Sequence, residues 1–349
     1  MFYAGLDLGK RHSYLAVVDE RGRTVRQGRV ESSPEGLLWA LSGLGGGLKL
    51  ALEATRAWEW AYDLLSDQGL EVTLVHPYKT RAIASARIKS DRLDAHILAQ
   101  LLRADLVARA YVAGKETRAL RELLRYRAFL VDLQRAVKNR IHALLDRLLV
   151  RPPMATPFSR KGLEWLAGLQ LPEPYGQELA GLLRLLSALR QELELVAGRV
   201  REAARRDERA ILLTTVPGLG YYLALLVLAE IGDVSRFPTA RHLASYAGLV
   251  PSTYASGGVV RHGAITKQGS RFLRWALVEA AMHAVRRPGP LQEFYRRLLV
   301  GKGAQKARVA VARKLAKAVF WMLKTGRSYK EVEPYLAPQG QASSSLYMA

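Results

Sequence analysis

The stretch FYAGLDLGKRHSYLAVVDERGRTVRQGRV (2–30) decides the fold class, because it contains three short apolar segments joined by polar links. Segments 2–8, 13–19 and 23–30 have the residue pattern of β-strands, and the link DERGR (19–23) contains a glycine suited to a turn. The chain is therefore predicted to open with three successive strands.

Helix and strand patterns alternate beyond this opening. The sequence predicts a helix at about 34–44, a strand at 48–53, a helix at 56–68, a strand at 69–77 and two helical segments reaching about 105. Hairpins followed by right-handed crossovers give a mixed sheet with helices on its faces. We expect the first and fourth strands to lie side by side in an α/β domain.

Two long helices are predicted after this domain, at 117–149 and 175–206, separated by the proline-rich segment RPPMATP (151–157). Their apolar residues recur at steps of three and four, which is typical of amphipathic helices. This pattern suits a coiled-coil arm used in self-association as a dimer or tetramer, and it equally suits a helical bundle joining two domains.

The last part of the chain is predicted to be mainly α-helical, with helices at 270–286 and 304–324. The segment VPGLG (216–220) between two helical patterns resembles a helix-hairpin-helix turn, in which backbone N–H groups can bind a phosphate. We expect four regions: 1–108 as a metal-binding catalytic domain, 109–209 as the long-helix region, 210–335 as a second functional domain and 336–349 as a disordered tail.

The charge of the chain indicates a polyanionic partner. The net charge of the 349 residues is +22, and residues 213–349 hold 19 Lys and Arg against 6 Asp and Glu. A strongly basic domain beside a balanced one is typical of nucleic-acid-binding proteins. The sequence lacks cysteine, a signal-peptide pattern and a long apolar run, so we expect a cytoplasmic, nucleoid-associated protein that neither forms disulfides nor crosses a membrane.

Four carboxylates stand out from the other acidic residues. Asp7 lies inside an apolar strand and Glu53 ends the predicted fourth strand, while Asp91 and Asp94 lie three residues apart, on one face of a predicted helix. Together they would form an oxygen-rich site suited to Mg²⁺ or Mn²⁺, with two ions able to support phosphoryl transfer. Taken alone, Asp91 could instead be an ordinary helix N-cap.

A serine in a glycine-rich segment is the candidate nucleophile of the basic domain. Ser256 precedes two glycines in YASGG, whose small residues leave its hydroxyl accessible, and Ser252 and Ser270 are rival nucleophiles. Nearby cations and the VPGLG glycines are candidate nucleic-acid contacts: Gly218, Gly220, Arg261, His262, Lys267, Arg271 and Arg274.

These motifs together resemble the DEDD transposases of bacterial insertion sequences, a group that includes the Piv-type DNA invertases. The resemblance rests on GLDLGK (5–10), LALEATRAW (50–58), KSDRLDAHILAQLL (89–102), LASYAGLVPSTYASGG (243–258) and GAITKQGSRFLRWALVEAA (263–281), besides VPGLG. It implies a RuvC-like, ribonuclease-H-type N-terminal domain in which the four carboxylates bind Mg²⁺. It also implies a C-terminal transposase domain whose serine, matched by Ser256, bonds covalently to DNA, an oligomerising coiled coil, and a structured guide RNA.

We therefore expect a Mg²⁺-dependent transposase or site-specific recombinase that joins DNA strands through a serine–DNA intermediate. We hypothesise that the metal site of one subunit activates Ser256 of a partner chain, because no His-Asp pair is visible near this serine. The alternatives are a Holliday-junction resolvase-like nuclease that uses metal-activated water, and a nucleic-acid-binding protein with a decayed site. A sugar-kinase or actin-like fold shares the GLDLG start but needs a second phosphate-binding hairpin, which the sequence lacks.

Overall fold

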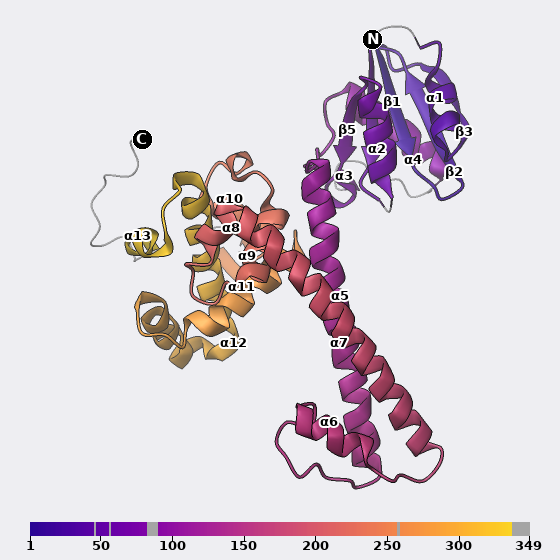
Figure 1. Cartoon of the computed structure of the whole chain (residues 1–349). Helices are drawn as coiled ribbons and strands as arrows, with labels where there is room; N and C mark the ends of the chain where they lie inside the picture. The colour runs from indigo at the N-terminus through magenta and orange to yellow at the C-terminus, as the bar shows by residue number, and fades with distance from the viewer. Residues whose placement is uncertain (45–46, 56, 82–89, 257–258, 337–349) are drawn as a thin grey trace. The chain divides into compact units, whose positions relative to one another are not determined.

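The computed structural model describes residues 1–44, 47–55, 57–81, 90–256 and 259–336 (Figure 1). The chain divides into two compact units, Met1–Val112 and Ala113–Ala349, which are taken in turn. The predicted tail at 336–349 lies almost entirely outside the described residues.

The first unit is built on a five-stranded mixed sheet with the strand order β3-β2-β1-β4-β5. β2 pairs antiparallel with β1 and β3, whereas β4 pairs parallel with β1 and β5. The strands are β1 (Phe2–Asp7), β2 (His12–Val18), β3 (Thr24–Glu31), β4 (Leu48–Glu53) and β5 (Glu71–Val75). The adjacency of the first and fourth strands is thus confirmed, as is the mixed α/β architecture.

Helices cover both faces of this sheet because its central strands are apolar on both sides. Even-numbered residues of β1 and β4, such as Leu6 and Leu52, pack in one apolar cluster with α1 (Pro34–Leu41) and α2 (Trp58–Asp67). Ala51 packs in another cluster with α4 (Asp91–Arg103), and the short α3 (Pro77–Arg81) follows β5.

The second unit begins with two long helices, α5 (Lys115–Arg147) and α7 (Tyr175–Arg206), which lie side by side (Figure 1). Both lie within one or two residues of the predicted bounds. Between them the structure adds α6 (Arg160–Ala167), which the sequence analysis did not predict. Ser159 caps this short helix by accepting a hydrogen bond from the Gly162 N–H at 3.2 Å.

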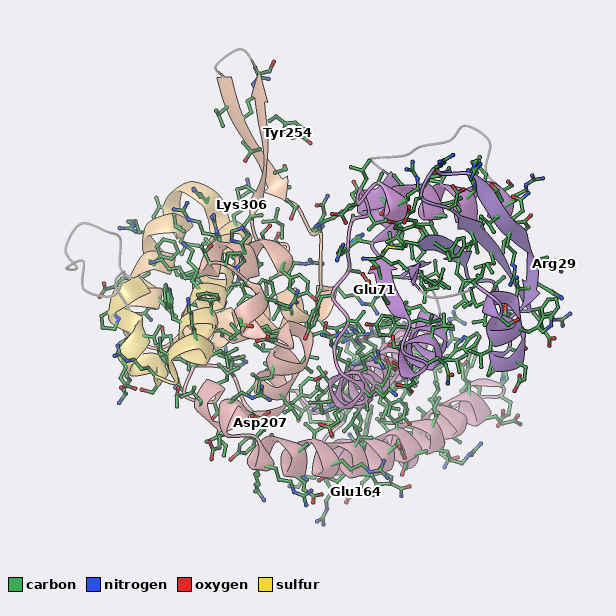
Figure 2. All side chains as sticks on the ribbon, turned by 90° about the horizontal axis from the view of Figure 1, so that it is seen from above. Arg29, Glu71, Glu164, Asp207, Tyr254 and Lys306 are labelled. Atoms are coloured by element: carbon green, nitrogen blue, oxygen red, sulfur yellow. The ribbon has the colours of Figure 1, made fainter. Side chains whose placement is uncertain are left out.

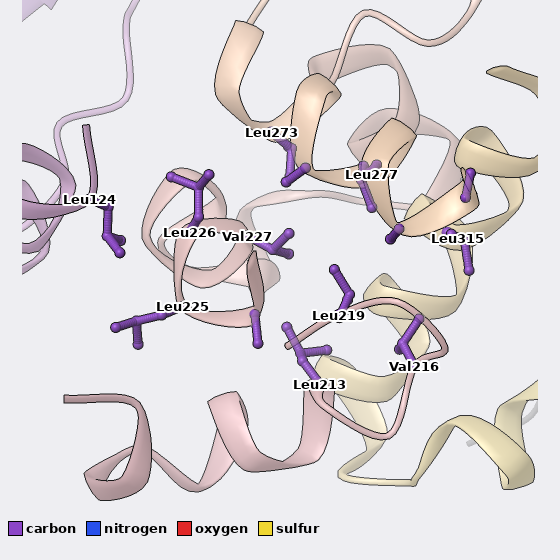
Figure 3. Packing of buried hydrophobic residues seen from close by; sticks show 14 of the residues in the cluster. Leu124, Leu213, Val216, Leu219, Leu225, Leu226, Val227, Leu273, Leu277 and Leu315 are labelled. Atoms are coloured by element: carbon purple, nitrogen blue, oxygen red, sulfur yellow. The ribbon is translucent and has the colours of Figure 1, made fainter. Parts of the chain in front are cut away.

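The remaining helices are α8 (Glu208–Leu213), α9 (Tyr221–Ile231), α10 (Ala240–Tyr246), α11 (Arg271–Ala284), α12 (Pro290–Thr325) and α13 (Tyr329–Val332), with short 3₁₀ turns at Val234–Arg236 and Glu333–Leu336. They pack around α9, which is buried from Ala224 to Ile231, and around α12: α8 and α11 contact both of these helices, whereas α10 and α13 contact α12. Figure 3 shows leucines and valines of this core meeting from α5, α8, α9, α11 and α12. α12 is interrupted at Gly303, where φ is 75° and ψ is 163°.

The sequence pattern predicts a turn at Pro251 and Ser252 and a loop at Ser256 and the two glycines after it. The turn is wrong, because both residues lie in β6 (Pro251–Ser256), which pairs antiparallel with β7 (Val259–Ile265), and the two glycines lie outside the described residues. Glycine and serine weaken the strand pattern in the sequence, but Tyr254 and the β-branched residues of β7 favour extended backbone. The candidate nucleophile therefore lies on a strand.

None of the helices among the described residues is long and apolar enough to cross a membrane.

Candidate active site

Asp7 and Glu53 lie at the carboxyl ends of two neighbouring parallel strands. Leu6 of β1 lies opposite Leu52 of β4, so the next residue of each strand is one of these acids. Both acidic residues are half-buried. The two carboxylates therefore share one edge of the sheet.

They also share one face of it. Side chains alternate between faces along a strand, so Asp7 points to the same side as Gly5. α4 packs directly on this side: a Cβ added at Gly5 would lie only 2.1 Å from the Ala95 carbonyl oxygen and 2.6 Å from the Ala99 nitrogen. The absence of a side chain at Gly5 lets α4 approach the backbone of β1.

The direction of α4 follows from its last turns. Gln100 Nε2 donates a hydrogen bond to the Gly22 carbonyl oxygen at 2.7 Å, and the Arg103 guanidinium donates to the Glu20 carbonyl oxygen at 3.3 Å. The link containing Gly22 and Glu20 follows Val18, which pairs with Tyr3 near the start of β1. The end of α4 is therefore near the start of β1, and its first turn lies toward the edge where Asp7 and Glu53 are found.

That first turn contains the other two acids. Ser90 caps the helix, since its Oγ accepts a hydrogen bond from the Leu93 N–H at 3.2 Å. The interpretation of Asp91 as the N-cap is therefore wrong. Asp91 is exposed and Asp94 is half-buried, and both follow the cap within one turn.

The four carboxylates provide oxygen ligands of the type that Mg²⁺ and Mn²⁺ prefer, so the donor set fits a hard divalent cation. As they stand, no three acidic or histidine side chains among the described residues are gathered closely enough to hold a metal ion. The fold places Asp7 and Glu53 at one edge of the sheet and directs the first turn of α4 toward that edge.

Two further residues occupy the same row of the sheet, and the sequence analysis missed them. Tyr14 lies opposite Asp7. Arg29, which is labelled in Figure 2, lies opposite Tyr14. Directly opposed residues of neighbouring strands project from the same face. The Arg29 guanidinium also lies 2.8 Å from His12 Nδ1. The register of the opening hairpin would have identified both residues.

The three candidate serines differ in their surroundings. Ser270 caps α11, accepting a hydrogen bond from the Leu273 N–H at 3.1 Å, while its hydroxyl donates to the buried Glu230 carboxylate at 2.8 Å. The Ser252 hydroxyl donates to the Ala264 carbonyl oxygen at 3.1 Å. Ser256 is exposed and is the last residue of β6.

The candidate nucleic-acid contacts also separate into groups. Arg261, Lys267 and Arg271 are exposed, and His262 lies on β7 with only its backbone described. Arg274 instead donates from one nitrogen to the carbonyl oxygens of Ala247 and Lys267, at 3.2 and 3.1 Å. Burial lowers the pKa of the Arg274 guanidinium below its usual value. This arginine ties α11 to the preceding loops.

The two glycines of VPGLG also have different surroundings. Gly218 has a φ of +91°, and a Cβ added there would lie 2.6 Å from the Ala280 carbonyl oxygen of α11. Gly220 is the N-cap of α9, and nothing lies within 4 Å of a Cβ added at that position. Gly218 is thus required by packing, whereas Gly220 leaves room for a partner.

Comparison with known proteins identifies the family. The transposase family described as IS116/IS110/IS902 matches residues 210–296, and a second family, described as a transposase, matches residues 4–150.

Three relatives extend the match over most of the chain. The mini-circle putative transposase for IS117 of Streptomyces coelicolor is 31% identical over 323 residues, covering 73% of this chain and 77% of its own length. The transposase for insertion sequence element IS1111A of Coxiella burnetii is 26% identical, covering 93% and 90%. The transposase for insertion sequence element IS1328 of Yersinia enterocolitica is 25% identical, covering 92% and 96%. The chain belongs to the IS116/IS110/IS902 family of DEDD transposases, enzymes that catalyse DNA strand transfer.

Proposed function

We propose that this transposase is a divalent-metal-dependent recombinase that cuts and rejoins DNA strands at insertion-sequence ends and target through a covalent serine–DNA intermediate. The observation that carries the metal part is the shared sheet edge, where Asp7 and Glu53 end neighbouring strands and α4 directs its first turn toward them.

Asp7, Glu53, Asp91 and Asp94 would hold Mg²⁺ or Mn²⁺, with two ions as the expected number. The bound metal would supply positive charge that stabilises the charge developing on phosphate oxygens during phosphoryl transfer. Arg29, on the same face, would add a fixed cation near the entering DNA. An ionised carboxylate accepts and does not donate, which is the form that ligation of a cation requires.

Ser256 is the nucleophile that the structure supports best. Its hydroxyl is exposed, whereas the Ser252 hydroxyl donates to a backbone carbonyl and the Ser270 hydroxyl donates to the buried Glu230. Attack of the Ser256 oxygen on a DNA phosphate would form a phosphoserine ester and break one phosphorus–oxygen bond to a sugar. The serine proton passes to a base, and the departing sugar oxygen takes up a proton. Attack by another strand's hydroxyl would reverse these steps and reseal the DNA.

Nucleic-acid contacts are proposed for the exposed cations of the second unit. Arg261, Lys267 and Arg271 are exposed and would bind phosphate oxygens, and the open space at Gly220 would admit a helix-hairpin-helix-like backbone contact. The resemblance of the sequence motifs to DEDD transposases implies a structured guide RNA, and the net charge of +22 supports a second polyanionic partner of this kind.

The long helices α5 and α7 are proposed to form a coiled-coil arm that oligomerises the protein. Leu133 of α5 and Leu185 and Leu195 of α7 are 38%, 49% and 63% exposed, although the two helices already pack on each other. Exposed leucines on paired helices favour contacts with further helices. Within this proposal the three structured regions remain 1–108, 109–209 and 210–335.

The test is a covalent complex. Purified protein is mixed with Mg²⁺, element-end DNA and the flanking noncoding transcript, and protein–DNA adducts are resolved on a denaturing gel. The proposal predicts an adduct with wild type and with Ser252→Ala, and none with Ser256→Ala or Asp94→Asn. Nicked DNA without an adduct, dependent on Asp94 and indifferent to Ser256, would establish the water-using nuclease instead.

A further inference from the structure

A groove of about 600 Å³ lies within the second unit, between α5 and α11. This volume is in the range of pockets that hold a small organic ligand. Four arginines line this α5–α11 groove: Arg125, Arg127 and Arg135 from α5, and Arg271 from α11. Only Arg271 was identified from the sequence, because the other three lie on a helix whose pattern indicated self-association.

Aromatic rings accompany these cations. Phe129 of α5 and Trp275 of α11 line the groove and remain 56% and 39% exposed, which is unusual for rings of this size. Phe272 is also part of the lining, with the guanidinium groups of Arg125 and Arg271 at 5.2 and 4.8 Å from its ring centre. The groove thus offers flat apolar surfaces interleaved with positive charge.

The walls of the groove are held in place by partners behind them. Arg125 donates through two nitrogens to the buried Glu230 carboxylate, at 3.1 and 2.9 Å. The Arg127 guanidinium lies 4.0 Å from the centre of the Tyr222 ring, which packs edge-on against Trp275. A surface that is already ordered loses less conformational entropy when a ligand binds.

The charge of the groove selects the ligand. Asp132 is the acidic residue of the lining, and it already pairs with Arg135 at 2.8 Å. Positive charge therefore exceeds negative charge among the lining residues, and an anion is favoured. An anion that also stacks on the exposed aromatic rings must have a flat apolar part, and in a nucleotide this part is the base.

We infer that the α5–α11 groove binds unpaired nucleotides of single-stranded DNA, with bases stacked on Phe129 and Trp275 and phosphates held by the arginines. Bases are free to stack on a protein only when they are outside a duplex. DNA is the committed ligand because the family transfers DNA strands, and a strand that is exchanged must leave its partner. The inference deepens the proposed recombinase function, on which it rests for its biological role.

The test measures binding without catalysis, so that it is independent of the metal and of Ser256. Full-length protein in EDTA is titrated into fluorescein-labelled oligothymidine of about 12 nucleotides, and anisotropy gives Kd. Loss of one base stack is expected to weaken binding about tenfold for Phe129→Ala and for Trp275→Ala, with Trp275→Phe restoring most of it. Trp39→Ala is the matched control, since Trp39 is 79% exposed and lies on α1.

A thermodynamic cycle separates stacking from charge and from misfolding. An oligonucleotide of abasic sites keeps the phosphates and lacks the bases, so wild type, which loses both stacks, should bind it about 100-fold more weakly than oligothymidine. Phe129→Ala keeps only the stack on Trp275 and should therefore bind the abasic strand only about tenfold more weakly than oligothymidine. Arg271→Ala should lower the dependence of binding on salt, by roughly 0.7 in the logarithmic slope for each phosphate that the variant no longer neutralises.

Unchanged Kd in both aromatic variants would overturn the inference. Tighter, aromatic-dependent binding of oligouridine RNA than of DNA would overturn the assignment to DNA, and equal binding of a duplex would overturn the requirement for unpaired bases. The covalent-adduct assay on Phe129→Ala separates the two proposals. An adduct formed at the wild-type level would support the proposed recombination chemistry, whether or not the groove binds single-stranded DNA.

Discussion

Replacing Gly5 by alanine should displace the helix that carries half of the candidate metal site. The added Cβ would lie 2.1 Å from the Ala95 carbonyl oxygen and 2.6 Å from the Ala99 nitrogen, where ordinary contact begins at 3.4 Å. Both neighbours are helix backbone, which cannot rotate away as a side chain can. α4 must therefore shift by about 1.3 Å, the difference between 2.1 and 3.4 Å.

This shift of α4 should lower both the stability of the protein and the rate of strand transfer. Overpacking of a core typically costs about 1–3 kcal/mol, and a contact with rigid backbone belongs at the upper end. A misplacement of about 1 Å in a catalytic group costs about 100-fold in rate. Gly5→Ala should therefore remain folded, lose about 3 kcal/mol of unfolding free energy, and transfer DNA strands about 100-fold more slowly.

The matched control is Gly28→Ala. Gly28 also lies within a strand of the same sheet, and nothing lies within 4 Å of a Cβ added there. Urea unfolding measures the stability of both variants, and single-turnover strand transfer with Mg²⁺ measures the rate. If Gly5→Ala has the same stability and the same strand-transfer rate as Gly28→Ala, α4 does not pack on β1 as described and does not position the acids.

Three further predictions concern the second unit. Glu230→Ala leaves the partly buried Arg125 guanidinium without its carboxylate and should lower the unfolding free energy by about 3 kcal/mol. The control Glu293→Ala removes an exposed carboxylate and should change the unfolding free energy by less than about 0.5 kcal/mol. A wild-type unfolding free energy for Glu230→Ala, measured by urea unfolding, would contradict this prediction. Burial and the neighbouring Glu333 raise the pKa of Tyr329 above the usual tyrosine pKa of 10.0. The folded state therefore favours neutral Tyr329, and the stability that this contributes is complete below pH 10.0 and is lost as the pH rises above that value. Wild type should therefore lose thermal stability above about pH 10 more steeply than Tyr329→Phe, and equal slopes would exclude this tyrosine as the cause. In Gly218→Ala the added Cβ would lie 2.6 Å from the Ala280 carbonyl oxygen of α11, at a residue whose φ is +91°. This variant should have a Tm about 5 °C or more below that of wild type in a calorimetric scan, and an unchanged Tm would show that the turn tolerates a side chain.

Much of the first unit could be predicted because its signals are local. The apolar segments, the turn at 19–23 and the glycines at 45–47 limit the lengths of the strands, and the crossover rule then places β4 beside β1. Asp7 and Glu53 follow from this topology, since each ends a strand of the adjacent pair.

Other features depend on contacts that the sequence does not display. The direction of α4 depends on Gln100 and Arg103 reaching a turn about 80 residues earlier in the chain. The α5–α11 groove joins helices separated by more than 100 residues, and Arg125 looks like any exposed arginine until the buried Glu230 is seen beside it. The pairing of β6 with β7 was missed because the small residues of β6 carry little strand propensity, which the pairing outweighs.

The central claim is that the four carboxylates at the sheet edge hold the metal that strand transfer requires. Mn²⁺ binding, counted by electron paramagnetic resonance of the free ion, tests it without DNA and without activity. We predict about two Mn²⁺ ions bound by wild type, weakened binding in Asp7→Asn and in Asp94→Asn, and wild-type binding in Glu71→Gln, a control on the exposed start of β5. Wild-type Mn²⁺ binding by Asp7→Asn and Asp94→Asn would contradict the account.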